Sequence, residues 1–185
     1  MAQLPRTLRN FSLFVDGTGY AGKVTEMTLP TLTVATEEYR AGGLDAPIAI
    51  DMGMEALTAS FTLAEYDPEI LKLFGLYDQN ATQLTVRGAL QRNGDTDAVS
   101  MVVNLTGSFS SFDAGAMEAG SMTEASFEMQ VRYYKLEIAN EVLHEIDVEN
   151  MKRIINGTDQ LESLRTAMGV GSSNATNTGG NNGAP

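Results

Sequence analysis

Apolar and polar residues alternate along most of the chain, and turn residues separate the alternating runs. A period of two is typical of antiparallel sheets that bury one face. A hairpin is predicted at Asp16-Gly17-Thr18-Gly19, because an Asp-Gly pair tolerates the positive backbone angles of a tight hairpin turn. We predict strands over 11–15, 20–28, 31–40, 48–63, 83–92, 99–109, 122–138 and 141–148.

Two of these runs, 31–40 and 48–63, exceed the usual strand length of about 5 to 6 residues. A glycine-rich stretch, 41–47, joins them. Strands of this length, joined by a loop, are expected to project beyond the core of one domain. The second run places four apolar residues on one face: Ile48, Ile50, Met52 and Met54.

Alternation along 122–138 predicts that one face of this strand is apolar and the other polar. The predicted apolar face consists of Phe127, Met129, Val131 and Tyr133.

The period changes in two places. After Asp67, which can cap a helix, Pro68 opens a short amphipathic segment. Its apolar residues are Ile70, Leu71, Leu73, Phe74 and Leu76. A second helical stretch is predicted to open at Thr158 and Asp159 and to end at Gly169, with Leu161, Leu164 and Met168 at helical spacing.

Residues 169–185 consist almost entirely of Gly, Ser, Asn, Ala and Thr. This composition offers too little apolar surface to offset about 1–2 kcal/mol of backbone entropy per ordered residue. We therefore predict one domain over 1–168, followed by a flexible low-complexity tail over 169–185.

Composition narrows the possible functions. The 185 residues contain 12 Lys and Arg against 24 Asp and Glu, a net charge of -12. Affinity for nucleic acid comes mainly from cations that neutralise phosphates, so we expect no specific nucleic-acid binding. Absence of cysteine excludes disulfides, thiolate metal sites and cysteine nucleophiles, and a single histidine excludes histidine-rich metal sites.

The N-terminus shows neither a secretory signal nor a membrane span, which predicts a cytosolic protein.

The segment from Gly17 to Lys23 matches part of a phosphate-binding loop. Val24 replaces the magnesium-binding Ser or Thr, and the segment lies between two predicted strands, so we interpret it as a hairpin turn. Acid pairs such as Glu37-Glu38 are expected by chance among 24 acids.

His144 is the other candidate for chemistry, since Glu145 and Asp147 follow it closely. In a strand, His144 would face Val142 and Ile146, away from both acids, which favours a core-edge or interface histidine. No nucleophile–base pair converges, so we predict no enzyme and no catalytic, cofactor-binding or metal-binding residues.

The connection from Thr36 to Pro47 combines tyrosine, arginine, acids and glycines. This mixture is typical of a binding loop or an assembly contact, with an ordinary exposed hairpin loop as the alternative. The same connection belongs to a set of motifs that closely resembles the major tail tube protein family (FII type) of contractile-tailed bacteriophages and R-type pyocins. The resemblance runs from about Leu8 to Gly169, on Leu13-Phe-Val-Asp-Gly, Thr28-Leu-Pro, residues 36–47, Ile50-Asp-Met-Gly-Met-Glu-Ala, Phe74-Gly-Leu, Tyr133-Tyr-Lys-Leu-Glu, His144-Glu-Ile-Asp and Ile155-Asn-Gly-Thr-Asp-Gln-Leu.

The resemblance implies a mainly β fold: an antiparallel β-barrel or sandwich protomer with one short flanking helix and a C-terminal helical segment. Six copies would form a ring, and rings would stack helically into the inner tube of a virion tail, assembled in the host bacterial cytoplasm. By the same resemblance, the contacts between subunits or rings come from the 36–52 connection, namely Glu38, Tyr39, Arg40, Gly42, Gly43, Asp45, Pro47 and Asp51.

The implied partners are the tail sheath outside, the tape measure protein and transiently DNA in the lumen, and baseplate and terminator proteins at the ends. Sheath contraction would drive the tube through the cell envelope, and the genome would pass through it. An acidic lumen would keep phosphates from adhering. The alternatives are a tube of a contractile bacteriocin or secretion system, which carries no genome, and a β-sandwich carbohydrate-binding or adhesin module, against which the absence of tryptophan counts.

Overall fold

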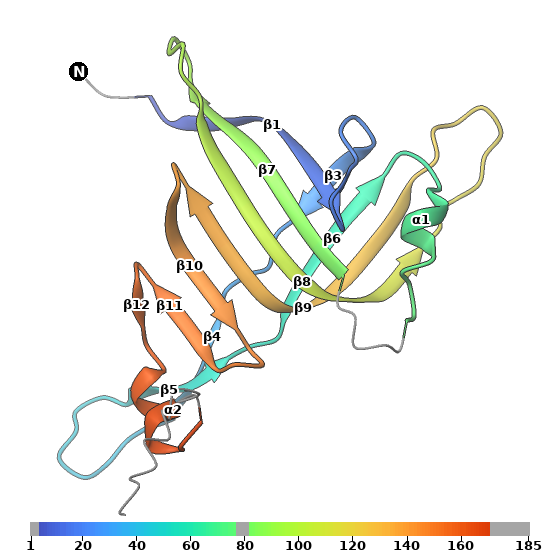
Figure 1. Cartoon of the computed structure of the whole chain (residues 1–185). Coiled ribbons are helices and arrows are strands. Elements are labelled where there is room, and N and C mark those ends of the chain that lie inside the picture. The colour runs from blue at the N-terminus through green and yellow to red at the C-terminus, as the bar shows by residue number, and fades with distance from the viewer. Residues whose placement is uncertain (1–3, 77–81, 171–185) are drawn as a thin grey trace, which may run out of the picture.

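The computed structural model describes residues 4–76 and 82–170. Within these ranges the chain forms twelve strands and two short helices (Figure 1). The predicted tail from residue 171 onwards lies outside the described residues. In chain order the elements are β1 (Arg6–Val15), β2 (Thr18–Gly19), β3 (Val24–Thr28), β4 (Val34–Tyr39), β5 (Ile48–Met54), β6 (Leu57–Leu63), α1 (Pro68–Leu71), β7 (Thr82–Arg92), β8 (Val99–Asp113), β9 (Ala125–Ile138), β10 (Glu141–Asp147), β11 (Lys152–Ile155), β12 (Thr158–Asp159) and α2 (Glu162–Ala167).

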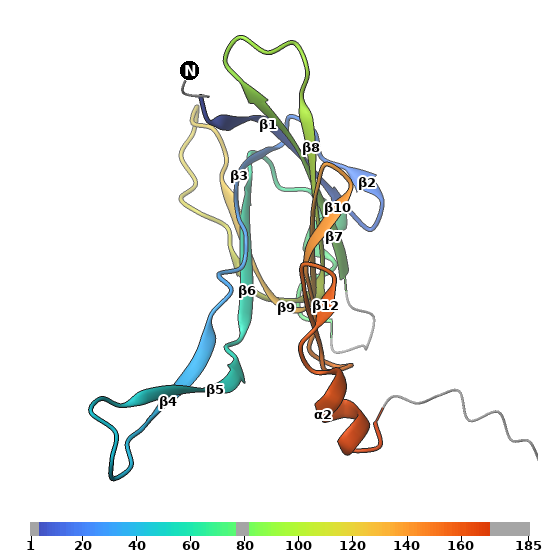
Figure 2. The same ribbon diagram turned by 90° about the vertical axis from the view of Figure 1, so that its left-hand side faces the viewer.

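Ten strands form one antiparallel sheet in the order β12-β11-β10-β9-β8-β7-β1-β2, and β6 and β3 branch from β9. The branch arises because β9 changes partner along one edge. Its first half, 125–131, pairs with β6, and its second half, 133–138, pairs with β10. The two views show that the β3–β6 branch faces the layer that contains β1, β7 and β8 (Figures 1 and 2). This arrangement confirms the predicted mainly β, antiparallel fold.

The core lies between these two layers and follows the predicted alternation. Every second residue of β6, from Leu57 to Leu63, is buried, and so are Val103, Leu105 and Phe109 of β8. Phe61 of β6 stacks on Phe127 of β9 with ring centroids 5.2 Å apart. Burial of such side chains contributes about 1.5–3 kcal/mol each, so these inward faces account for most of the driving force for folding.

The predicted hairpin exists, but its turn is only the two residues Asp16 and Gly17. Thr18 and Gly19 form β2, and the strand predicted over 20–28 begins only at Val24. Both turn residues have positive φ, 47° and 84°, and Val15 pairs with Thr18 across the turn. The Asp16 carboxylate also accepts a hydrogen bond of 2.9 Å from the backbone N–H of Gln83. The segment that resembled a phosphate-binding loop is therefore this hairpin and the turn after it, and β3 follows it where a phosphate-binding loop would have a helix.

The predicted strand over 48–63 is wrong as a single element. It divides at Glu55 and Ala56 into β5 and β6, which belong to different sheets. The positive φ of Gly53, 106°, lies at a register irregularity between β4 and β5, where the β5 strand carries an extra residue. Because of this bulge, Met54 packs against the core while Met52 stays exposed.

The predicted apolar face of β9 is correct as far as Val131 and wrong beyond it. Thr106 of β8 pairs with Tyr133, but the next residue, Gly107, pairs with Val131, so Arg132 is an extra residue. An extra residue shifts the alternation by one position. Consequently Tyr134, only 4% exposed, takes the core position that simple alternation assigns to Tyr133.

The first predicted helix exists but is short. The Asp67 side chain caps it by accepting a hydrogen bond of 2.9 Å from the N–H of Glu69, and Ile70 is buried beneath it. The helix ends at Leu71, so the apolar residues beyond it do not form a helical stripe.

The second predicted helix begins later than its capping signal suggested. Thr158 and Asp159 form β12 and pair with β11, and α2 starts at Glu162. The Asp159 carboxylate instead accepts hydrogen bonds from groups in the β11 and α2 region, described below. Gly169, with a φ of 68°, follows the helix as predicted.

Candidate subunit contact surfaces

A two-stranded hairpin stands apart from the large sheet and is called the arm here. It consists of β4, β5 and the loop between them, Val34 to Met54. Figure 2 shows it extending from the lower end of β6, away from the layers that enclose the core. This projection agrees with the expectation that the two long predicted strands reach beyond the core.

One face of the arm is mostly apolar and exposed, and its charged residue is Glu37, directly opposite Ile50. Tyr39 lies directly opposite Ile48 in the ladder, and Ile50 and Met52 follow Ile48 at alternate positions. Their exposed fractions range from 45% to 60%. Burial of apolar surface contributes about 25 cal/mol per Å², so a partner that covers this face would gain affinity from it.

All the residues predicted as assembly contacts lie on the arm, and all are exposed. Glu38 and Tyr39 end β4, while Asp51 lies in β5 near the root of the arm. The Arg40 guanidinium donates a hydrogen bond of 3.4 Å to the backbone oxygen of Asp45, across the loop. The loop between the strands holds Arg40, Gly42, Gly43, Asp45 and Pro47.

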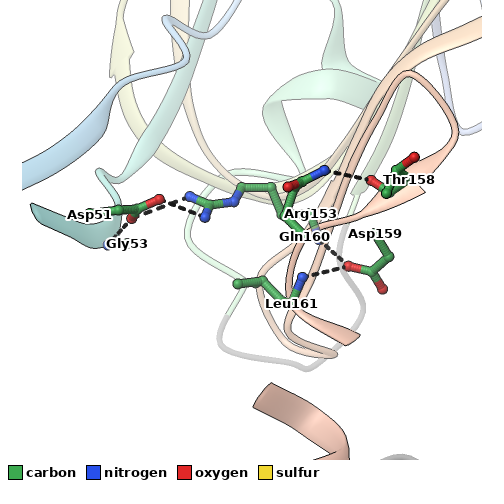
Figure 3. Close-up of polar contacts among 7 residues, drawn as sticks. All are labelled: Asp51, Gly53, Arg153, Thr158, Asp159, Gln160 and Leu161. Atoms are coloured by element: carbon green, nitrogen blue, oxygen red, sulfur yellow. Dashed lines mark hydrogen bonds and ion pairs between the residues drawn. The ribbon is translucent and has the colours of Figure 1, made fainter. Parts of the chain in front are cut away.

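Asp51 differs from the others because its partner lies in the same chain. Its carboxylate accepts a hydrogen bond of 2.7 Å from Nη2 of Arg153 on β11 and one of 2.8 Å from the N–H of Gly53 (Figure 3). Arg153 is mostly buried, with 14% of its side chain exposed. The Arg153 guanidinium and the Gly53 N–H hold the pKa of Asp51 below its ordinary value of 3.8. This ion pair fixes the root of the arm to the large sheet.

A second ion pair, between Arg165 and Asp159, is linked to the first through the backbone of Arg153. Nη2 of Arg165 on α2 lies 2.6 Å from Oδ2 of Asp159, and this guanidinium lowers the pKa of Asp159. Oδ1 of Asp159 accepts hydrogen bonds from the backbone N–H groups of Leu161, at 3.0 Å, and of Arg153 (Figure 3). The two ion pairs together connect the arm, β11, β12 and α2.

Sequence reasoning did not find Arg153, Asp159 or Arg165 as parts of this network. Arg153 is 102 residues away from Asp51 in the chain. No spacing of residues along the sequence indicates such a pair, because only the pairing of β10 with β11 brings Arg153 to the arm.

Two grooves flank the root of the arm. One, of about 350 Å³, runs between Met54 and Leu57 on one side and Ile146 and Val148 on the other. The second, of about 480 Å³, contains His144 together with Ile146 and Val34.

His144 occupies a different position from the one expected. A register irregularity between Val142 and His144 puts these two on opposite faces of β10. His144 shares the groove with Ile146, as predicted, and its Nδ1 is enclosed without a hydrogen-bond partner among the described residues. Within the same residues no group of three or more His, Asp or Glu side chains is placed to hold a metal ion.

None of the described helices is long and apolar enough to cross a membrane.

We expect Asp51→Asn to loosen the arm at its root. Amide protection in β4 and β5, measured by hydrogen exchange on dissociated protomers, should fall because the substitution weakens the link to Arg153. A carboxylate with a lowered pKa stabilises the fold above the ordinary pKa of Asp, and this contribution is lost as the pH falls through its folded pKa. The wild type should therefore lose its advantage over Asp51→Asn as the pH drops below about 4.

Asp45→Asn is the matched control, because it neutralises an exposed carboxylate of the same arm for which no ion pair occurs among the described residues. Its protection should equal that of the wild type. Equal protection in Asp51→Asn would show that the ion pair does not hold the arm.

Comparison with known proteins agrees with the resemblance found in the sequence. A family model described as phage tail tube protein FII matches residues 5–169. The tail tube protein of Escherichia phage P2 is 30% identical over 170 residues, covering 90% of this chain and 99% of that protein. The major tail tube protein of Serratia phage KSP20 is 31% identical over 171 residues, covering 91% of this chain and 98% of that protein.

Solved structures share the fold at much lower identity. A chain of the sheath–tube complex of PVC, an extracellular contractile injection system, has a TM-score of 0.57 at 13% identity, and the match covers 72% of this chain and 91% of that chain. A chain of the anti-feeding prophage cap gives 0.57 at 12%, covering 74% and 93%. The family model covers nearly all of the described residues, and the two phage relatives match along almost their full length. The chain therefore belongs to the phage tail tube protein FII family.

Proposed function

We propose that six copies of this protein form a ring and that the rings stack into the inner tube of a contractile phage tail. The observation that carries the proposal is the arm, whose exposed apolar face is fixed to the large sheet by an ion pair. A face of this kind is useful only when another surface covers it. The arm, including the predicted contacts from Glu38 to Asp51, is then the element that contacts a neighbouring subunit.

Free strand edges supply a second means of assembly. Among the described residues, β3 pairs only with β6, and β2 pairs only with β1. An unpaired edge offers backbone donors and acceptors to a strand of another chain. In a ring, neighbouring protomers can close these edges, so that long strands from six copies line one continuous wall.

The proposed role is mechanical and contains no catalytic step. The sheath surrounds the tube, terminator and baseplate proteins occupy its ends, and the tape measure protein and then DNA occupy its lumen. In the PVC injection system, the solved complexes contain a tube with its sheath and a sheath/tube terminator. The tube would assemble in the cytoplasm of the host bacterium and function in the virion tail.

The charge of the protein suits passage of DNA. Each copy carries a net charge of -12, so a ring of six carries six times as much. Like charges repel phosphates from the wall, which favours transit over adhesion. Lysine substitutions at acids that line the lumen should therefore slow DNA release and lower infectivity; unchanged release and infectivity would contradict this part of the proposal.

Deletion of residues 41–46 tests the role of the arm. We expect a folded protomer, because this loop lies outside the core, but no tubes in electron micrographs of the purified protein. Deletion of the six residues 116–121 from the exposed β8–β9 connection is the control and should leave tubes intact. Normal tubes after removal of 41–46 would remove the arm from the assembly contacts.

A further inference from the structure

Three arginines gather where the first residues of β1 meet the last residues of β7, and we call them the arginine head. Arg6 lies directly opposite Arg92 in the ladder. Arg9, three residues further along β1, is the extra residue of a bulge between Leu8 and Asn10. Like charges placed directly opposite each other destabilise an antiparallel pair.

The arginine head has no charge partner in the part of the protomer that the structure describes. Among the described residues, Arg6, Arg9 and Arg92 take part in none of the seven ion pairs. Nε of Arg92 is shielded from solvent and has no hydrogen-bond partner there either. Asp95 and Asp97, in the adjacent turn, form no ion pair with it in the described structure. Three of the chain's 12 cations are thus left for an anionic partner.

The arm carries the complementary charge. Between Val34 and Met54 the acids are Glu37, Glu38, Asp45 and Asp51, and Arg40 is the one Lys or Arg residue. Arg153 already compensates Asp51, so three carboxylates remain. Glu37, Glu38 and Asp45 are all exposed and, in the described part of the chain, form no ion pair. Glu37 shares a face of the arm with Tyr39 and Ile50, and Glu38 lies on the opposite face, so both faces of β4 carry a carboxylate.

These two surfaces lie at opposite ends of the molecule. In both views the start of β1 and the β7–β8 connection are at the top, and the arm is at the bottom (Figures 1 and 2). A contact between opposite ends of identical copies cannot close on itself when the copies continue in one direction, and it builds a filament.

We propose that the arginine head of one protomer receives the acidic arm of a second copy in the next ring. This inference rests on the proposed tube and assigns its ring-to-ring contact to particular side chains. The pairing offsets the repulsion between Arg6 and Arg92 and orients successive rings the same way. Complementary charges also speed the encounter of rings and fix their register.

DNA is the other polyanion that arginines could bind. The net charge of -12 opposes its approach, and three arginines are few for a sequence-independent phosphate contact. A second copy of the chain provides three carboxylates outside any described ion pair, with Arg40 as the only cation beside them, on an exposed projecting element. Binding of DNA by these arginines would therefore overturn the proposal.

Two charge-reversed variants of the full chain test the contact. The head variant carries Arg6→Glu, Arg9→Glu and Arg92→Glu, and the arm variant carries Glu37→Lys, Glu38→Lys and Asp45→Lys. Each variant alone opposes like charges at the contact, so we expect rings but less than a tenth of the wild-type amount of sedimented tube. A mixture of equal parts restores opposite charges at every contact, and tubes should reappear.

Several readouts separate this contact from a folding defect. Circular dichroism of both variants should match the wild type, and a double variant with Arg6→Glu and Arg9→Glu avoids the half-buried Arg92 if the triple variant unfolds. Removal of one charge by Arg6→Gln should leave the melting temperature of the protomer unchanged or higher while it weakens stacking. Lys72→Glu is the matched control, because it reverses one exposed cation at the C-cap of α1, away from both surfaces, and should leave tube yield unchanged.

The outcomes distinguish the two proposals. A wild-type protein that forms neither rings nor tubes contradicts the proposed function itself. Wild-type tubes together with normal tubes from both folded variants, or a mixture that fails to restore tubes, overturns the arginine-head contact alone. Normal stacking of the head variant with weaker binding to a fluorescent duplex DNA would overturn it as well and would assign these arginines to nucleic acid.

Discussion

Replacement of Phe127 by alanine should lower the free energy of unfolding of the protomer by about 3–5 kcal/mol. Phe127 is 1% exposed, and its ring centroid lies 5.2 Å from that of Phe61, 5.7 Å from Phe109 and 5.0 Å from Phe112. The substitution removes a whole ring from the centre of this cluster and leaves a cavity between the two layers. Because domains are stable by only about 5–15 kcal/mol, this loss is a large share of the total stability. Urea unfolding followed by circular dichroism measures it.

Phe74→Ala is the matched control for Phe127→Ala. Phe74 is 42% exposed and contacts the same cluster at its margin, with its ring centroid 6.3 Å from that of Phe112. Its removal should cost clearly less than the removal of Phe127. Equal losses in the two variants would mean that the stability contributed by a phenylalanine of this cluster does not depend on how deeply it is buried.

Gly107→Ala should destabilise the protomer through the backbone. A Cβ atom at this position would meet the backbone oxygen of Gln130 at an impossibly short separation, and Cα of Val131 at 3.1 Å. The close approach results from the bulge at Arg132, where β9 moves toward β8. Since backbone atoms cannot rotate away, one of the strands must shift, and we expect a loss of about 1–3 kcal/mol or more in urea unfolding.

Gly42→Ala controls for the general effect of replacing glycine by alanine. No atom lies within 4 Å of a Cβ built on Gly42, which is in the exposed loop of the arm. Its unfolding free energy should stay within about 0.5 kcal/mol of the wild type. If Gly107→Ala behaved the same way, β8 and β9 would have to separate at the bulge without cost.

Features that depend on neighbouring residues were predictable from the sequence. The Asp16-Gly17 hairpin follows from the backbone preferences of two residues, and the Asp67 cap acts on a helix that starts at the next position. Alternation identified the buried residues of β8 because a strand turns successive side chains to opposite faces. The resemblance to tail tube proteins likewise rests on short contiguous motifs in the sequence.

Features that depend on bulges were not predictable. An extra residue on β9 at Arg132 moves the buried tyrosine from Tyr133 to Tyr134, and an extra residue on β10 turns His144 away from Val142. A bulge changes nothing in the composition of the strand that carries it. Only the register of the partner strand shows where the alternation slips.

By itself, the sequence determined the mainly β fold, the family and the segment that forms the arm, because each of these follows from local pattern or contiguous motifs. Tertiary structure alone decided that Asp51 is held by Arg153, that Arg6 faces Arg92, and that the arm and the arginine head lie at opposite ends. The physical reason is distance along the chain. Contacts between residues about a hundred positions apart depend on the order and register of strands in the sheet, which no local sequence pattern encodes.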